Sequence, residues 1–186
     1  MKKILIFVFL LSFCFQMKAQ LVVSDVTNTA VNKAGWIESL AKAGTQGETL
    51  LAQKNLLSQS INMYMKVSKV ISDNKMVYSM IDRQVKFIAG INKEMMRTDI
   101  ISVIAYDHYK SILRELSDTN KSNLEFLQTI VSPDSKMTDA DRFKLMRDLD
   151  KDSKAVVSQY YSEKDRYNEF NDNLKMIKSL QSTKQN

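Results

Sequence analysis

The side chains best suited to chemistry are scarce in this 186-residue sequence. It contains one histidine, His108, and one cysteine, Cys14. Nucleophilic catalysis needs a Ser or Cys with a base beside it, and zinc sites need several His or Cys ligands. No Gly-rich phosphate loop is present either. The inventory therefore predicts no catalytic residue, no cofactor site and no metal site, and the protein is not expected to be an enzyme.

One acidic triplet has the spacing that opens a calcium-binding loop: Asp148, Asp150 and Asp152. The sixth loop position is Ser153 where glycine is needed, and the twelfth is Gln159 where glutamate is needed. The triplet also lies within a helical pattern, in which Asp150 points away from the other two. A solvated helix surface is the better interpretation of these carboxylates.

Methionine is concentrated in the middle of the chain, where six of the 11 methionines fall between positions 63 and 96. Methionine adapts to irregular cores and to permissive binding surfaces. Tyrosine and histidine side chains over residues 106–109 add groups of the kind found at interfaces. The candidate partner-binding residues are Met76, Met80, Met95, Met96, Tyr106, His108 and Tyr109. Core packing, or for His108 a place on a helix surface, is the alternative for each of them.

Residues 1–19 have the features of a secretory signal peptide. Lys2 and Lys3 precede an apolar run over 4–15, and Ala19 is a suitable small residue for cleavage. Twelve apolar residues are too few to span a bilayer, so no stable membrane insertion is expected after cleavage. The predicted location is the periplasm or the extracellular space.

The expected mature chain, 20–186, is a single helical domain. Cys14 is lost with the signal peptide, and because it follows bulky Phe13 inside the apolar run, a lipoprotein is not expected. Three of the 27 basic residues are also lost, which leaves 24 against 21 acidic residues and no footprint for nucleic acid. Four glycines and one proline over the whole sequence favour an all-α fold.

The longest expected helix covers about 138–182. Thr138 and Asp141 have the spacing of an N-terminal capping pair. Residues on one stripe of this helix are mostly apolar or aromatic, which predicts that it packs lengthwise on a partner. The stripe consists of Met146, Leu149, Ser153, Val156, Tyr160, Glu163, Tyr167, Phe170, Leu174 and Ile177. Its later members Tyr160, Tyr167, Phe170 and Leu174 are expected inside the fold.

A helix over about 48–72 is the expected antiparallel mate, and the two together form the predicted spine. The middle helical region, about 75–131, is expected to contain three helices, with a break at the capping residues of 117–120. Ile104, Leu113 and Leu116 are expected to face inward. The predicted architecture is an elongated antiparallel helix bundle with a long C-terminal helix and a small helical appendage.

The start of the expected mature chain resembles that of a secreted family of conjugal transfer proteins of the TrbJ type, which are similar to minor pilus-tip subunits of type IV secretion systems. The resemblance lies in Leu21-Val22-Val23 followed by Asp25 and Asn28, although Val26 stands where proline is common. A Gln- and Leu-rich helix and a long C-terminal helix also fit. The resemblance implies a bundle of three long helices, exported and assembled with pilin.

The expected function is therefore that of an exported, non-enzymatic component of a conjugative apparatus. It would act by protein–protein binding in pilus assembly or at the pilus tip, with envelope or pilus proteins as partners. A periplasmic helical chaperone or envelope adaptor is the main alternative, because such proteins share the signal peptide and the long helical arms. A secreted enzyme is the third.

Overall fold

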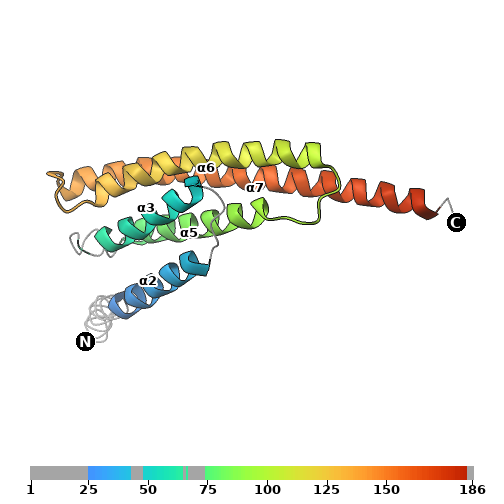
Figure 1. Cartoon of the computed structure of the whole chain (residues 1–186). Helices are drawn as coiled ribbons and strands as arrows, with labels where there is room; N and C mark the ends of the chain where they lie inside the picture. Colours follow the sequence, from blue (N-terminus) through green and yellow to red (C-terminus); the bar gives the residue numbers. More distant parts are fainter. Residues whose placement is uncertain (1–24, 43–47, 65, 67–73, 184–186) are drawn as a thin grey trace, which may run out of the picture. The chain divides into compact units, whose positions relative to one another are not determined.

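The computed structural model describes residues 25–42, 48–64, 66 and 74–183 (Figure 1). The described residues form helices and turns without a strand. The helices are α2 (Asp25–Lys42), α3 (Glu48–Tyr64), α5 (Lys75–Met95), α6 (Val103–Val131) and α7 (Asp139–Thr183). The predicted all-α class, with antiparallel packing and a long C-terminal helix, is confirmed. The expected signal peptide lies outside the described residues.

The chain divides into two compact units, Met1–Gly35 and Trp36–Asn186. Of the first unit, the structure describes only the opening turns of α2. The second unit contains α3, α5, α6 and α7. In the described part of the chain, no helix combines the length and the apolar character that crossing a membrane requires.

The C-terminal helix α7 begins as its sequence predicts. The backbone N–H of Asp141 donates to Thr138 Oγ1 over 3.2 Å, and the Thr138 N–H donates to Asp141 Oδ2 over 3.3 Å. This reciprocal pair satisfies donors that a helix start leaves free. The Thr138 hydroxyl also donates to Asp141 Oδ2 over 2.6 Å, and this bond is the main cause that lowers the Asp141 pKa below its usual value.

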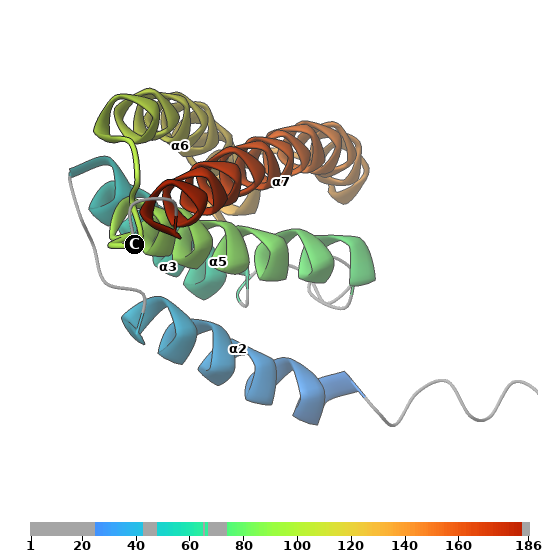
Figure 2. The same cartoon turned by 90° about the vertical axis from the view of Figure 1, so that its right-hand side faces the viewer.

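The antiparallel mate of α7 is α6, and the predicted pairing of 138–182 with 48–72 is wrong. Figure 1 shows α6 and α7 side by side over the length of α6, while α3 packs on α6 and α5. Viewed from the end, α6 and α7 lie beside the pair formed by α3 and α5 (Figure 2). Helix α3 ends at Tyr64, and most of the predicted remainder to 72 lies outside the described residues.

The mate is α6 because the expected break at 117–120 does not occur. Ser117 and Asn120 are buried and bind the buried Gln53 of α3 instead of capping a helix end. Gln53 Nε2 donates to Ser117 Oγ over 2.5 Å, and Asn120 Nδ2 donates to Gln53 Oε1 over 2.9 Å. With these polar groups bonded across to α3, α6 continues for 29 residues.

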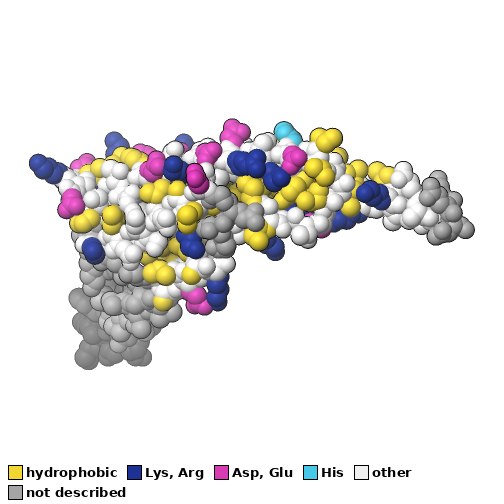
Figure 3. Space-filling model, in the orientation of Figure 1, with side chains coloured by type: hydrophobic (Ala, Val, Ile, Leu, Met, Phe, Trp, Pro, Cys, Tyr) yellow, Lys and Arg dark blue, Asp and Glu magenta, His cyan; other side chains and the backbone are white. Residues whose placement is uncertain are grey.

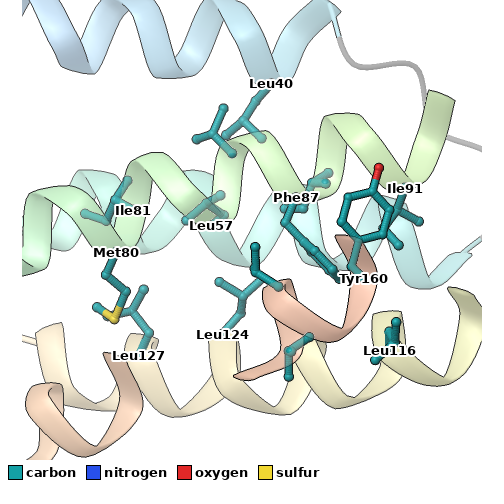
Figure 4. Close-up of a cluster of buried hydrophobic side chains, with 14 of the residues drawn as sticks. Leu40, Leu57, Met80, Ile81, Phe87, Ile91, Leu116, Leu124, Leu127 and Tyr160 are labelled. Atoms are coloured by element: carbon teal, nitrogen blue, oxygen red, sulfur yellow. The ribbon is translucent and has the colours of Figure 1, made fainter. Parts of the chain in front are cut away.

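The core lies where α3, α5, α6 and α7 meet (Figure 4). Tyr160 of α7 reaches α5, where its ring packs edge-on against Phe87 at 5.5 Å between centroids. On α2, Trp36 and Leu40 are buried, and the Trp36 ring lies 4.5 Å from the Tyr78 ring. Figure 4 also shows Met80 of α5 directed toward Leu127 of α6. These side chains join the helices into one apolar core.

The predicted stripe on α7 is buried only as far as Tyr167. Tyr160 and Tyr167 are inside, as predicted, whereas Leu174 is half-buried and Phe170 is 47% exposed. The prediction for Phe170 was therefore wrong. The prediction for Ile104 was also wrong, because this side chain is 85% exposed. Ile104 lies in the first turn of α6, and Phe170 lies at a hollow between α6 and α7 instead of against packed side chains.

Candidate protein-interaction surface

Five of the seven candidate partner-binding residues gather where α5 ends and α6 begins. Met95 and Met96 close α5, while Tyr106, His108 and Tyr109 lie in the first two turns of α6. The other two, Met76 and Met80, lie at the opposite end of α5, where Met80 is buried and Met76 is half-buried. The structure thus brings together the predicted residues from 95 to 109, and it places Met76 and Met80 away from them.

Tyr106 and Tyr109 are buried here and support the junction from within. The Tyr106 hydroxyl donates to the backbone carbonyls of Glu94 and Met95, at 3.0 and 2.9 Å. The Tyr109 hydroxyl donates to Glu94 Oε2 over 3.4 Å, and its ring stacks on Tyr167 with centroids 4.4 Å apart and planes 5° apart. Burial, and then the charge of Glu94, raise the Tyr109 pKa. With Met80, these two tyrosines belong to the core.

A buried carboxylate, Glu94, lies at the centre of the junction. Its side chain is 4% exposed, and it is paired with Arg97 Nη1 and Lys164 Nζ, each at 3.1 Å. An unpaired charge in such a position would destabilise the fold by several kcal/mol. The two cations and the hydroxyl donor offset this cost of burying the Glu94 carboxylate. Glu94 therefore joins the end of α5 to α6 and α7.

The connection from α5 to α6 is fastened to α7 by Arg97 and Asn171. Arg97 donates two hydrogen bonds of 2.9 Å to the Asp99 carboxylate and one to Asn168. Its Cζ atom lies 5.0 Å from the centre of the Tyr167 ring. The hydrogen bond from Arg97, and then one from Lys175, hold the Asp99 pKa well below its usual value. Asn171 accepts from the Ile101 N–H over 3.1 Å and donates to the Asp99 carbonyl over 2.8 Å.

Next to the residues bonded by Glu94, Arg97 and Asn171, three apolar side chains are exposed to solvent. Met96 is 51% exposed, Val103 69% and Ile104 85%. Met96 is held in place on its inner side, where its sulfur accepts a hydrogen bond from Asn92 Nδ2 over 3.5 Å. We call Met96, Val103 and Ile104 the junction patch. Three exposed apolar side chains at the end of α5 and the start of α6 form a candidate contact surface.

A second apolar feature is a hollow of about 400 Å³ between α6 and α7. An ion pair between Glu163 and Arg166 borders it. In Figure 3, hydrophobic side chains gather beside the single histidine, His108, which is exposed and lines this hollow. We call the hollow the α6–α7 groove, and its apolar and aromatic walls are formed by Ala105, His108, Tyr109, Ile112, Tyr167 and Phe170.

The described residues hold no group of three or more His, Cys, Asp or Glu side chains placed to bind a metal ion. Asp148 and Asp152 are exposed, while Asp150 is buried and bonded to Arg83 and Lys154. The three carboxylates of the possible calcium loop therefore face different surroundings on a continuous helix. Comparison of the chain with protein-family models, with curated proteins and with solved structures finds no match.

Sequence reasoning missed Glu94 and Arg97, although a signal for Glu94 was present. Glu94 lies three residues after the buried Ile91 and seven after the buried Phe87 of α5, and so continues the buried face. An acidic residue at such a position must find cations nearby, and Arg97 follows three residues later. The partner Lys164 comes from α7 and could not be assigned without knowing that α7 crosses the junction.

Proposed function

We propose that the protein is an exported, non-enzymatic binding component of a conjugative or type IV secretion apparatus, acting in pilus assembly or at the pilus tip. The assignment to this apparatus rests on the resemblance at residues 21–28. The geometry supports binding as the mode of action, because the described helices offer exposed apolar surface on a rigid support. The observation that carries the proposal is the junction patch, held out by the bonds of Glu94, Arg97 and Asn171.

The partners are envelope or pilus proteins that cover the junction patch. Large side chains that leave water completely at the centre of an interface supply most of its binding energy. Met96 and Ile104 can do so, because about half or more of each is exposed in the free protein. Met95, by contrast, is half-buried and packs against the core, so it is not a residue of the patch.

The test is a deletion of the gene followed by complementation, with transfer of DNA between cells as the measurement. Deletion should abolish or strongly reduce transfer without affecting growth. Complementation with a Met96→Glu, Ile104→Glu double variant should fail although the variant is exported and folded. Complementation with Leu51→Glu, a change at a 47%-exposed apolar residue on α3, should succeed. Full transfer with the double variant would disprove the patch.

One observation favours the alternative of a periplasmic chaperone or envelope adaptor. The end of α7 extends past the start of α6 and carries exposed Met176, Ile177 and Leu180, as the holding arm of a chaperone would (Figure 1). The same deletion separates the two proposals. Normal DNA transfer combined with depleted outer-membrane proteins would favour the chaperone or adaptor and exclude the conjugation assignment.

A further inference from the structure

The apolar stripe of α7 continues beyond the helix that covers it. Tyr167 is covered by Tyr106 and Tyr109 of α6, and Asn171 is bonded to Ile101, which precedes α6. After Asn171, α7 runs on to Thr183 beyond the start of α6 (Figure 1). Residues 172–183 form what we call the arm, on the order of 18 Å long at 1.5 Å per residue.

The arm has two distinct faces. Phe170, Leu174, Ile177 and Leu180 recur at spacings of three and four residues, so they share one face of the helix. Phe170, Ile177 and Leu180 are 47%, 48% and 59% exposed, and Met176, at the edge of this face, is 57% exposed. The other face carries Asp172, Lys175, Lys178, Ser179 and Ser182.

Contacts with the α5–α6 connection fix which way each face points. Lys175 Nζ lies 3.0 Å from Asp99 Oδ2 and 3.0 Å from Asp172 Oδ1. The polar face is therefore turned toward the connection, and the apolar face is turned away from it. That apolar face leads directly into the α6–α7 groove, because Phe170 belongs to both.

We propose that two copies of this chain associate in an antiparallel dimer, in which the arm of each copy lies in the α6–α7 groove of the other. The arm supplies protruding apolar side chains, and the groove supplies a recess with apolar walls. The groove and the apolar face of the arm are on the same side of α7. The groove lies beside residues 163–170, and the apolar residues of the arm follow at 174–180. A two-fold axis near residue 172 brings each arm to the groove of the partner, as an interface between identical surfaces requires.

The surface area that each copy can bury indicates the strength of this dimer. Four large side chains of the arm and its base, each about half exposed, offer roughly 300–400 Å² per copy, and the groove walls add to this. A stable interface uses about 800 Å² per partner, so the proposed dimer belongs to the weak class. The dissociation constant is expected in the micromolar range. This surface is separate from the junction patch, and the proposal does not depend on the conjugation assignment.

The first test is sedimentation velocity on the purified protein over about 1–500 µM. The wild type should shift from monomer to dimer across this range. An Ile177→Glu, Leu180→Glu double variant should remain monomeric with an unchanged melting midpoint, because both side chains are exposed in the monomer. Phe126→Glu, at a 40%-exposed site on the later part of α6, should dimerise like the wild type. A wild type that stays monomeric throughout, or a double variant that dimerises normally, would overturn the proposal.

The second test fixes the geometry and uses the absence of cysteine after position 14. Asn173 lies on the apolar face close to the proposed axis, so Asn173→Cys should form a disulfide-linked dimer under mild oxidation. Gln181 lies on the same face at the far end of the arm. Gln181→Cys should not form a disulfide-linked dimer, because the two copies of this residue are far apart in an antiparallel pair. Efficient cross-linking at 181 would indicate a parallel pair, and no cross-linking at 173 would exclude the proposed axis. Either result overturns the arrangement.

Discussion

Gly90 of α5 lies directly against Tyr160 of α7, so close that a Cβ atom at position 90 would be 2.6 Å from the Tyr160 hydroxyl oxygen and 3.1 Å from Cζ. Tyr160 is 1% exposed, and its ring is already packed edge-on against Phe87. It therefore has little room to move. The absence of a side chain at Gly90 is what lets a tyrosine of the long helix reach the surface of α5.

Gly90→Ala should therefore destabilise the protein. Alanine gains about 1 kcal/mol over glycine in a helix interior, whereas overpacking a core costs about 1–3 kcal/mol, so we expect a net loss on the order of 1 kcal/mol. Gly35→Ala is the matched control, because it also lies within a helix but has no atom within 4 Å of its Cβ position. It should be neutral or slightly stabilising. Urea unfolding measures both, and equal effects would contradict the steric account.

A further change locates the clash. Tyr160→Phe removes the oxygen that lies closest to position 90 while keeping the ring. In the Gly90→Ala background it should recover part of the lost stability, because the nearest collision is gone. In a double-mutant cycle the two changes should therefore be coupled. Additive effects would mean that the ring, and not the hydroxyl, sets the limit.

Arg142 closes the connection between α6 and α7. Its buried guanidinium donates to the carbonyls of Ser132 and Ser135, each over 3.0 Å, and also to that of Ile130. Arg142→Met would leave these acceptors without their donor, and we expect a loss of about 2–3 kcal/mol. Lys144→Met, at an exposed position two residues later, should change the free energy of unfolding little. Equal losses in thermal or urea unfolding would contradict this role.

Two aromatic residues three positions apart on α7 should respond very differently to truncation. Tyr167 is 6% exposed and lies between the Tyr109 ring and the Arg97 guanidinium, so Tyr167→Ala should cost about 3–4 kcal/mol. Phe170 is 47% exposed, and Phe170→Ala should cost less than about 1 kcal/mol in the monomer. The measurement is urea unfolding at a protein concentration of about 1 µM. A large loss for Phe170→Ala would mean that its face is covered.

The ion pairs of Asp150 predict a dependence of stability on pH. Burial raises the Asp150 pKa, but hydrogen bonds from Lys154 at 2.6 Å and Arg83 at 2.9 Å outweigh burial and lower it overall. A carboxyl whose pKa is lowered in the folded state stabilises it above the unfolded-state value, near 3.9, and loses this contribution as pH falls below that value. The stability difference between wild type and Asp150→Asn should therefore be present at pH 7 and shrink between about pH 4 and pH 2.

Asp152→Asn is the control for this prediction. Asp152 is on the same helix but exposed, so the substitution should change stability little at any pH. Urea unfolding at pH 7, 4 and 3 measures both variants against the wild type. A difference for Asp150→Asn that stays constant down to pH 3, or grows, would contradict the account.

The sequence by itself determined the class of the fold and the extent of its longest helix. Thr138 and Asp141 define the start of α7 through local hydrogen bonds, and the spacing of Met146, Leu149 and Val156 defines its buried face. Such features depend on neighbours within about one or two helical turns, so a periodic pattern is enough to predict them. Tyr160 and Tyr167 were correctly expected inside for the same reason.

Only the tertiary structure decided which helices pair and where the buried stripe ends. Ser117 and Asn120 are residues that favour helix ends when their side chains bond locally, but here they bond to Gln53, 64 and 67 positions earlier in the chain. That distant partner makes α6 long enough to be the mate of α7. Phe170 continues the pattern of Tyr167 in sequence, yet it is exposed because it lies at a hollow between α6 and α7 instead of against packed side chains. Periodicity shows which face of a helix is apolar; whether that face is covered depends on where the other helices begin and end.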